Sequence, residues 1–250
     1  MSQPEYELIY WPGLPGRGEF VRLLFEEAAV SYLDIAKTPD QAVPAVMSHI
    51  SAENRGDAHN PPPLAPPILK HGDLIINQLP NILLYLAPKL GLAPKEGDAV
   101  YHLNQISLTI IDGLVNEIHD THHPIAVGLY YEDQKEEAKK RSKYFIKDRL
   151  PKFFGYMQRV LEAKTSGQGP WLYGDSLTYV DLVLFQCVDG TAFAFPKSVQ
   201  ALEQSGKYDD VFKLYVEVKA RPNIAKYLAS DRRQPYGDGI WRRYPELEED

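Results

Sequence analysis

The segment from Glu5 to Arg22 constrains the fold more than any other part of the sequence, because it joins a strand, a loop and a helix. Leu8 to Trp11 is short, apolar and aromatic, which is typical of a buried strand. Prolines and glycines then interrupt the chain, and apolar residues recur at helical spacing between 18 and 28. A second strand at 31–35 would close a βαβ unit. The pattern therefore predicts a small α/β layer in which Tyr10 presents its hydroxyl at a strand end.

Composition limits the class of protein. The 250 residues, 44% of them hydrophobic, suffice for the core of one large domain or two small ones. No apolar run approaches the roughly 18 residues that a membrane-spanning helix needs. The start of the sequence has neither the basic region nor the apolar stretch of a signal peptide, which favours a cytoplasmic location. A formal charge of −7 argues against a nucleic-acid partner.

The order of the elements predicts two domains. Up to residue 88, strand-like and helix-like segments are mixed, with short strands at 68–69 and 74–76 around a turn. Prolines and glycines between residues 88 and 98 interrupt regular structure and mark a linker. The remainder of the sequence has the pattern of helices joined by short loops. We therefore expect an α/β domain at 1–88 and an all-helical domain at 98–250.

Two segments are expected to lie outside the packed core. Residues 51–63 are polar and rich in breakers, which predicts an exposed, mobile loop beside an active cleft. The acidic residues 245–250 form too short a segment for a domain and are expected to be a frayed tail.

Landmarks in a fixed order extend over most of the chain. They are the pair Tyr10-Trp11 before Gly16-Arg17 and a helix, Pro67 before the turn at 71–73, Gln78 before a helical run, and a helix cap at Thr178 and Asp181. Together they resemble the glutathione transferases, specifically tyrosine-type classes such as sigma, mu and pi. The resemblance implies a thioredoxin-like N-terminal domain, an all-α C-terminal domain and a homodimer.

The resemblance also implies a reaction. It is the transfer of the glutathione thiolate to an electrophilic, hydrophobic substrate, as in detoxification, with no metal. Tyr10 would be the catalytic residue, since a hydrogen bond worth about 1.5 to 3 kcal/mol lowers a thiol pKa by roughly one to two units. The remaining site residues implied are Arg17, Pro66, Pro67, Gln78 and Leu79 for glutathione, with a cis peptide before Pro67, and Asp112 as a candidate contact across the dimer.

The residue types by themselves leave other roles open. A tyrosine such as Tyr10 also suits a packed strand position. Arg17 equally suits an ordinary surface or interdomain ion pair, and Asp112 suits an exposed surface position.

Leu79 departs from the family pattern, which has Ser or Thr at this position to hold the γ-glutamyl carboxylate. The amino end of the helix, with Pro80 in its first turn, still offers N–H groups to an anion. The missing hydroxyl is expected to weaken glutathione binding by roughly ten- to a hundred-fold. Two alternatives therefore stay open: a non-catalytic binding or regulatory protein with this fold, and a glutathione-dependent peroxidase or isomerase.

Two further groups of residues have ambiguous chemistry. His119, His122 and His123 have spacings at which imidazoles share a helix face and bind metals. No fourth ligand with a convincing spacing accompanies them, so we expect a helix end or cleft wall, with the histidines available to a polar second substrate. Cys187, the single cysteine, has apolar neighbours and is expected to be a small buried hydrophobe.

Overall fold

The computed structural model describes residues 5–249, which divide into two compact units. The first comprises residues up to 100 together with 221–235, and the second comprises 101–220 with the residues from 236 onward. Packing defines these units, so the domain boundaries at 88 and 98 stay a prediction. None of the described helices combines the length and apolar character needed to cross a membrane. The first four residues, on which the signal-peptide argument rests, lie outside the described residues.

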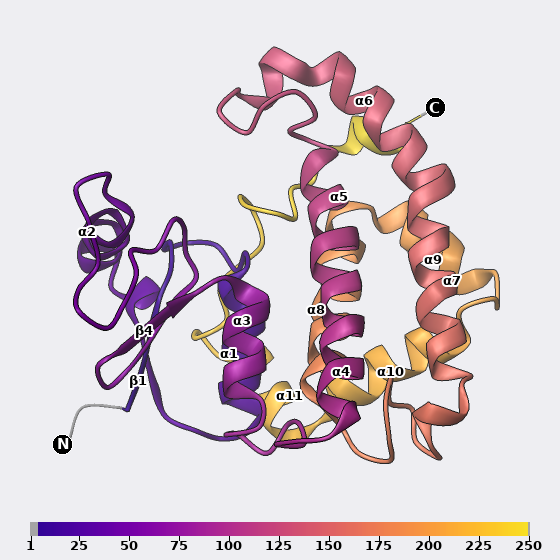
Figure 1. Cartoon of the computed structure of the whole chain (residues 1–250). Coiled ribbons are helices and arrows are strands. Elements are labelled where there is room, and N and C mark those ends of the chain that lie inside the picture. The colour runs from indigo at the N-terminus through magenta and orange to yellow at the C-terminus, as the bar shows by residue number, and fades with distance from the viewer. Residues whose placement is uncertain (1–4, 250) are drawn as a thin grey trace. The chain divides into compact units, whose positions relative to one another are not determined.

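A four-stranded sheet organises the first unit (Figure 1). Its strands lie in the order β2-β1-β3-β4, with β1 parallel to β2 and the other pairs antiparallel. A parallel pair needs a crossover connection, which α1 (Gly18–Glu27) supplies. This is the thioredoxin-like arrangement expected from the sequence. The strand bounds are β1 (Tyr6–Ile9), β2 (Tyr32–Asp34), β3 (Ile68–His71) and β4 (Leu74–Asn77).

Helices cover both faces of this sheet. A short 3-10 turn (Ile35–Lys37) leads into α2 (Pro39–Ile50), which packs on one face, whereas α1 and α3 (Leu79–Leu86) lie on the other (Figure 1). Strand side chains alternate between the faces, so one residue in two points toward α2. The core on the α2 side comprises Ile9, Ile35, Ala42, Val46 and Ile68.

Residues 221–235, although late in the sequence, pack in the first unit. Their helix, α11 (Pro222–Leu228), packs against α1. The Tyr227 hydroxyl donates to the buried Glu19 carboxylate of α1 at 2.7 Å. Two ion pairs, Arg221 with Glu27 and Arg232 with Glu26, join the same segment to the last turn of α1.

The polar loop between α2 and β3 is anchored at one residue. Most of its residues are exposed, as predicted, but Asn60 is only 6% exposed. The Asn60 amide donates to the Asp73 carbonyl and accepts the Ile75 N–H, both at 2.8 Å. The Asp57 carboxylate accepts the Asn60 N–H at 2.8 Å. These bonds attach the loop to the hairpin of β3 and β4.

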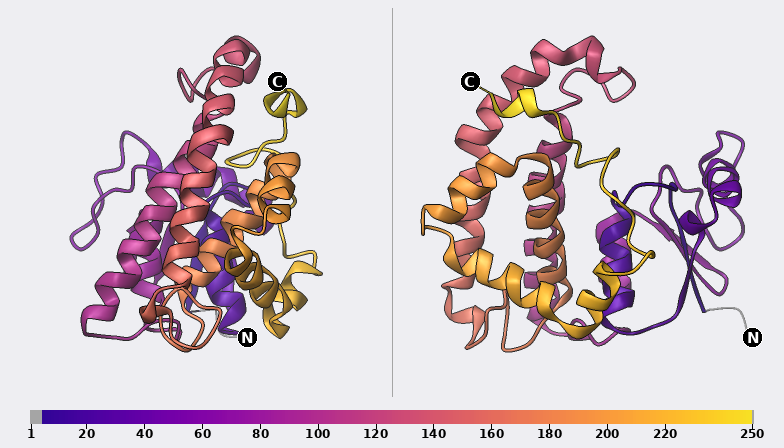
Figure 2. Two further views of the ribbon diagram at one scale, coloured as in Figure 1. Left: turned by 90° about the vertical axis from the view of Figure 1, so that its right-hand side faces the viewer. Right: turned by 180° about the vertical axis from the view of Figure 1, so that it is seen from behind.

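Three long helical runs dominate the second unit (Figure 2). In two of them a π-helical segment joins two α-helices, and Pro151 lies near the start of α7, shortly after the second π-helical segment. The first run is α4 (Asp98–Leu108), Thr109–Val115 and α5 (Asn116–Asp120), the second is α6 (Lys135–Tyr144), Phe145–Arg149 and α7 (Leu150–Leu161), and the third is α8 (Tyr179–Ala194). The unit also contains α9 (Pro196–Gln204), α10 (Asp209–Ala220) and 3-10 turns at Tyr131–Gln134, Lys164–Ser166 and Pro245–Glu248.

The predicted helix cap is present at the start of α8. The fully buried Asp181 carboxylate accepts the Thr178 N–H at 2.7 Å, the Thr178 hydroxyl at 3.1 Å and the Leu172 N–H at 2.8 Å. One carboxylate thus satisfies donors of the cap and of the preceding loop. Cys187 is fully buried on the same helix, as predicted.

Residues 245–248 of the acidic C-terminal segment are packed, so the prediction of a frayed tail was wrong for them, while Asp250 lies outside the described residues. Glu246 accepts the Lys135 ammonium at 2.7 Å, and Glu248 accepts the Ser198 N–H at 2.8 Å. Leu247, between them, is buried. Figure 2 shows this segment, in yellow, close to α6. The acidic residues find donors on α6 and α9, which composition does not reveal.

Asp181→Ala is expected to destabilise the protein by about 3 to 5 kcal/mol, because it removes the acceptor of three donors in a buried position. Urea denaturation measures this loss. Glu203→Ala, at an exposed position of α9 without such partners, is the control and should change stability by less than about 0.5 kcal/mol. A loss below about 1 kcal/mol for Asp181→Ala would contradict the structural role of the cap.

Candidate functional site

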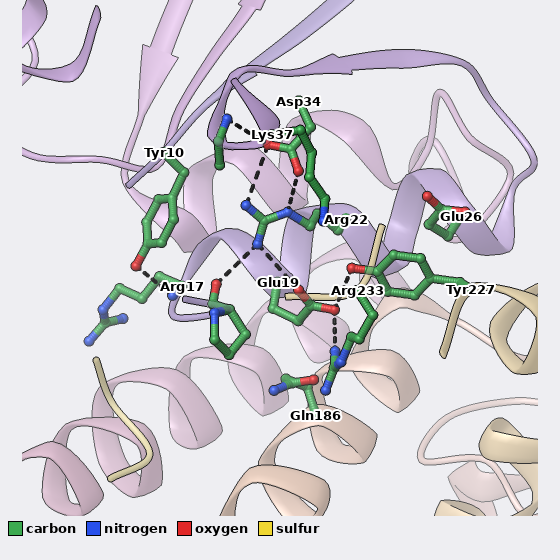
Figure 3. Close-up of polar contacts among 12 residues, drawn as sticks. Tyr10, Arg17, Glu19, Arg22, Glu26, Asp34, Lys37, Gln186, Tyr227 and Arg233 are labelled. Carbon is green, nitrogen blue, oxygen red and sulfur yellow. Dashed lines mark hydrogen bonds and ion pairs between the residues drawn. The ribbon is translucent and has the colours of Figure 1, made fainter. Parts of the chain in front are cut away.

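Tyr10 lies directly after β1 and is enclosed by the loop that follows it. Its side chain is 6% exposed, and its hydroxyl oxygen accepts the Arg17 backbone N–H at 2.8 Å (Figure 3). A Cβ on Gly16 would overlap this hydroxyl, and a Cβ on Gly18 would lie 2.8 Å from the ring. Only glycine therefore allows the loop to approach Tyr10 so closely. From the sequence, Gly16 was interpreted as a breaker and Gly18 as the start of a helix, and the steric reason for both glycines was missed.

The Tyr10 phenol is held in its protonated form. Burial raises its pKa above the ordinary value near 10, while the Arg17 N–H and the nearby Arg22 and Arg17 charges act in the opposite direction. The hydroxyl therefore carries its proton at neutral pH. Accepting the Arg17 N–H also polarises the O–H bond and strengthens it as a donor. A donating hydroxyl can stabilise an anion placed beside it, whereas it cannot serve as a general base.

Arg22 is fully buried and connects the Tyr10 loop to the sheet. Its guanidinium donates to the Pro15 carbonyl at 3.2 Å and to the Asp34 carboxylate at 2.7 Å. It also pairs with Glu19 at 3.2 Å and lies 5.8 Å from the centre of the Tyr10 ring. Arg22 therefore fixes the loop whose backbone holds Tyr10. Sequence reasoning missed Arg22, because its partners Pro15, Glu19 and Asp34 are not adjacent to it in the sequence and form no recognisable motif with it.

Glu19 is the second buried charge of this network. It accepts from Arg22, from the Tyr227 hydroxyl and from Arg233, as Figure 3 shows. Two arginines thus face two carboxylates, those of Glu19 and Asp34, and the buried charges balance. Removal of one member of such a pair leaves its partner buried and uncompensated, which typically costs about 3 to 5 kcal/mol.

Tyr10, Pro67 and Gln78 converge at one end of the sheet. In the antiparallel register of β1 and β3, Ile9 lies opposite Ile68, so Tyr10, which follows β1, and Pro67, which precedes β3, lie at the same end of the sheet. Ile68 also pairs with Asn77 of β4, which places Gln78 at that end too. The cis peptide expected between Pro66 and Pro67 is present. The structure thus brings together these predicted residues of the first unit from three adjacent strand ends.

Gln78 has an unusual backbone conformation. Its φ of 69° and ψ of 113° lie in a region that residues with a Cβ rarely adopt, and such strain typically costs about 1 to 3 kcal/mol. Its side chain is exposed. Its carbonyl accepts the Ile82 N–H at 2.9 Å, so Gln78 begins α3. Backbone strain of this size persists where surrounding structure imposes it, and it is frequent in ligand sites.

The first turn of α3 offers backbone donors at the same place. Helix geometry leaves the N–H groups of Leu79 and Asn81 without intrahelical acceptors, and Pro80 has no N–H. The Leu79 side chain is 2% exposed and packs in the core. Leu79 can therefore contribute only its backbone to an anion, and the effect of the missing hydroxyl on affinity stays a prediction.

The other predicted site residues occupy different settings. Arg17 is half-buried, and its backbone N–H is the group that binds Tyr10. A role for its side chain in orienting a ligand stays a prediction. Asp112 lies in the π-helical segment of the second unit and is exposed. Its contact across a dimer likewise stays a prediction.

The three histidines form a packed cluster. The centres of their rings lie 4.7 to 5.0 Å apart. His122 is 1% exposed, and its Nε2 donates to the Ile240 carbonyl at 2.9 Å. Burial lowers the pKa of His122 to about 3, so its ring is neutral. Among the described residues, no group of three His, Cys, Asp or Glu side chains is arranged to hold a metal. His122 thus anchors the C-terminal segment and is not exposed to a substrate.

Comparisons with known proteins point to one family. A family model described as "Glutathione S-transferase, C-terminal domain" matches residues 119–231. The glutathione S-transferase of Plasmodium yoelii yoelii is 26% identical over 88% of this chain and 92% of its own length. Glutathione S-transferase P 1 of Xenopus laevis is 25% identical over 92% of this chain and 94% of its own length. The crystal structure of a monomeric glutathione S-transferase from the hookworm Necator americanus has the same fold, with a TM-score of 0.62 at 22% identity over 93% of this chain and 100% of that one.

His122→Gln is expected to reduce the acid sensitivity of the fold. The unfolded chain binds a proton at His122 near pH 6.5, whereas the folded protein does so only near pH 3. This contribution to stability is therefore intact above pH 6.5 and declines toward pH 3, by at most about 1.4 kcal/mol per pH unit. Glutamine can still donate to Ile240 but does not titrate.

Urea denaturation at pH 7.5, 5.5 and 4.5 measures this difference. Between pH 7.5 and 4.5 the variant should lose about 1 to 3 kcal/mol less than the wild type. His59→Gln, in the exposed loop, should retain the wild-type dependence. If the free energy of unfolding changed equally with pH in the wild type and in His122→Gln, the lowered pKa of the buried His122 would be refuted.

Proposed function

This chain belongs to the glutathione transferase family, and from that premise we propose that it transfers glutathione, as its substrate, to an electrophile at the Tyr10 site. The convergence of Tyr10, Pro67 and the strained Gln78 at one end of the sheet carries this proposal. It supplies a hydroxyl donor and helix N–H groups within one region of the first unit. Such donors suit anions, and glutathione offers a thiolate and carboxylates.

The Tyr10 hydroxyl stabilises the thiolate in this proposal. A free thiol with a pKa near 8.5 is only about 3% ionised at neutral pH. A donated hydrogen bond worth about 1.5 to 3 kcal/mol lowers that pKa by roughly one to two units, so a large part of the bound glutathione is thiolate. Its sulfur then forms a bond to the electrophilic carbon, and the leaving group departs with the bonding electron pair.

The amino end of α3 binds the γ-glutamyl carboxylate in this proposal. The Leu79 and Asn81 N–H groups and the positive end of the helix dipole attract an anion. The exposed Gln78 amide lies at the same end and supplies a side-chain donor. Pro66 and Pro67 shape the neighbouring backbone, and Arg17 adds a positive charge at the start of α1.

The wider setting follows from the family. We propose that the electrophile is hydrophobic, that the reaction serves detoxification and that the protein acts in the cytoplasm. We also propose a homodimer, in which Asp112 of one subunit approaches the glutathione amine of the other. The relative described as monomeric shows that a dimer is not general among proteins of this fold, and Asp112 has this role only if the dimer forms.

Tyr10→Phe is expected to lower kcat/KM by roughly ten- to a hundred-fold, because it removes the hydroxyl and preserves the packed ring. The affinity for glutathione should change by less than about threefold. Calorimetric titration of reduced glutathione and steady-state assays with 1-chloro-2,4-dinitrobenzene measure both quantities. The apparent thiol pKa in the pH–rate profile should rise by about one to two units.

Tyr101→Phe, at an exposed position of α4, is the control for this experiment. Unchanged activity in Tyr10→Phe would refute the role of its hydroxyl. A wild-type protein without detectable glutathione binding would favour the non-catalytic alternative. Glutathione binding with turnover only of a hydroperoxide would favour the peroxidase.

Gln78→Gly is expected to have opposite effects on stability and binding. Glycine relieves the strained conformation, so unfolding should cost about 1 kcal/mol more. Loss of the amide should weaken glutathione binding about tenfold. Thermal denaturation and calorimetry measure the two effects.

Ala29→Gly is a matched control, because Ala29 also has a positive φ, of 53°, but lies outside the proposed site. It should stabilise the protein similarly and leave glutathione affinity unchanged. Equal affinity in wild type and Gln78→Gly would show that Gln78 does not bind glutathione.

A further inference from the structure

The first unit contains a cavity of about 530 Å³ that the proposed conjugation does not use. The end of α1, strand β2 with the residues after it, and the returning segment at α11 form its walls. Tyr10, Pro67 and Gln78 do not line it. We propose that this cavity binds a small organic anion whose body is apolar or aromatic. Its lining includes Tyr32, Leu33, Lys37, Lys226 and Arg232.

The carboxylates of the cavity are already neutralised. Glu26 accepts Arg232 through two hydrogen bonds of 3.0 and 2.6 Å. Asp34 accepts the buried Arg22 guanidinium at 2.7 Å. Neither carboxylate is therefore free to balance a further cation, although both contribute to the lining.

Two lysines remain with uncompensated charge. The Lys37 ammonium donates to the Asp231 backbone carbonyl, which orients it but does not neutralise it. Within residues 5–249, no hydrogen bond or ion pair is found for the Lys226 ammonium, which is exposed. Two positive charges thus border one cavity in a chain whose formal charge is −7. Such a local excess favours an anion over a cation or a neutral molecule.

Apolar and aromatic residues share the rest of the lining with Ser31, Thr38 and Asn223. The half-buried Tyr32 ring stacks on the fully buried Phe25, with centres 4.6 Å apart and planes inclined by 16°, so Tyr32 and not Phe25 presents aromatic surface to the cavity. Leu33 is 41% exposed, and Ala29 and Val30 add aliphatic surface. An inorganic anion would interact only with the charges, whereas an anion carrying a ring would also cover apolar surface. The volume lies within the usual range for small-molecule sites, about 300 to 1,000 Å³.

The lining comes from segments that are distant in the sequence. α11 contributes Asn223 and Lys226, and the residues that follow it contribute Arg232. The Asn223 amide donates to the Glu27 carbonyl at 2.9 Å, so this wall is attached to α1. The cavity is therefore part of the packed first unit.

Phenyl phosphate is a suitable probe, because it combines an anionic group with one ring. We would titrate it into the ¹⁵N-labelled full-length protein and follow the amide resonances. Saturable shifts should be confined to residues 25–38 and 223–232 and should persist with saturating glutathione. Inorganic phosphate and benzyl alcohol, which each lack one feature, should bind at least about tenfold more weakly.

Charge-reversal variants locate the site. Lys226→Glu should weaken phenyl phosphate binding about tenfold or more, whereas Lys95→Glu, exposed in the segment after α3, should bind like the wild type. Absence of saturable shifts up to about 10 mM would overturn the proposal. Displacement by glutathione, or equal weakening by both variants, would also overturn it, since the first outcome places the anion at the Tyr10 site and the second indicates only non-specific attraction.

Discussion

The buried Arg22 guanidinium is the interaction on which the first unit depends. It holds the Pro15 carbonyl, the Asp34 carboxylate and the Glu19 carboxylate at once. A charge without exposure is tolerable only when its donors are bonded and its charge is balanced, and here both conditions hold. Because the loop continues from Pro15 to the N–H that binds Tyr10, the position of the Tyr10 hydroxyl depends on this network.

The network also accounts for the packing of residues 221–235 in the first unit. Glu19 needs more donors than Arg22 provides, and Tyr227 and Arg233 supply them. A fragment that stopped at residue 100 would leave this buried carboxylate with one cation and without its hydroxyl donor. The first unit is thus complete only with residues 221–235, and the same segment that completes the network also forms a wall of the second cavity.

Local patterns were sufficient to predict much of this molecule. The strand, loop and helix around Tyr10, the long helical runs and the Asp181 cap all depend on residues close in sequence. The pairs of Glu19 with Tyr227 and of Glu246 with Lys135 join residues more than a hundred positions apart, and neither has a periodicity to reveal it. The identity of Leu79 showed that a hydroxyl is absent, but only its burial shows that the side chain belongs to the core.

Backbone conformation separates the two candidate sites of the first unit. Of the described non-glycine residues, only Ala29 and Gln78 have a positive φ. Ala29 follows the end of α1, where the Val30 N–H bonds the Phe25 carbonyl at 3.0 Å in the usual closure of a helix, so helix termination accounts for its conformation. Gln78 precedes a helix, where a residue normally has extended backbone, and its ψ of 113° is outside the left-handed helical well. The requirements of helix α3 do not account for this strain, so the conformation supports the proposal that Gln78 and the α3 amino end aim a side-chain amide and two N–H groups at one anion.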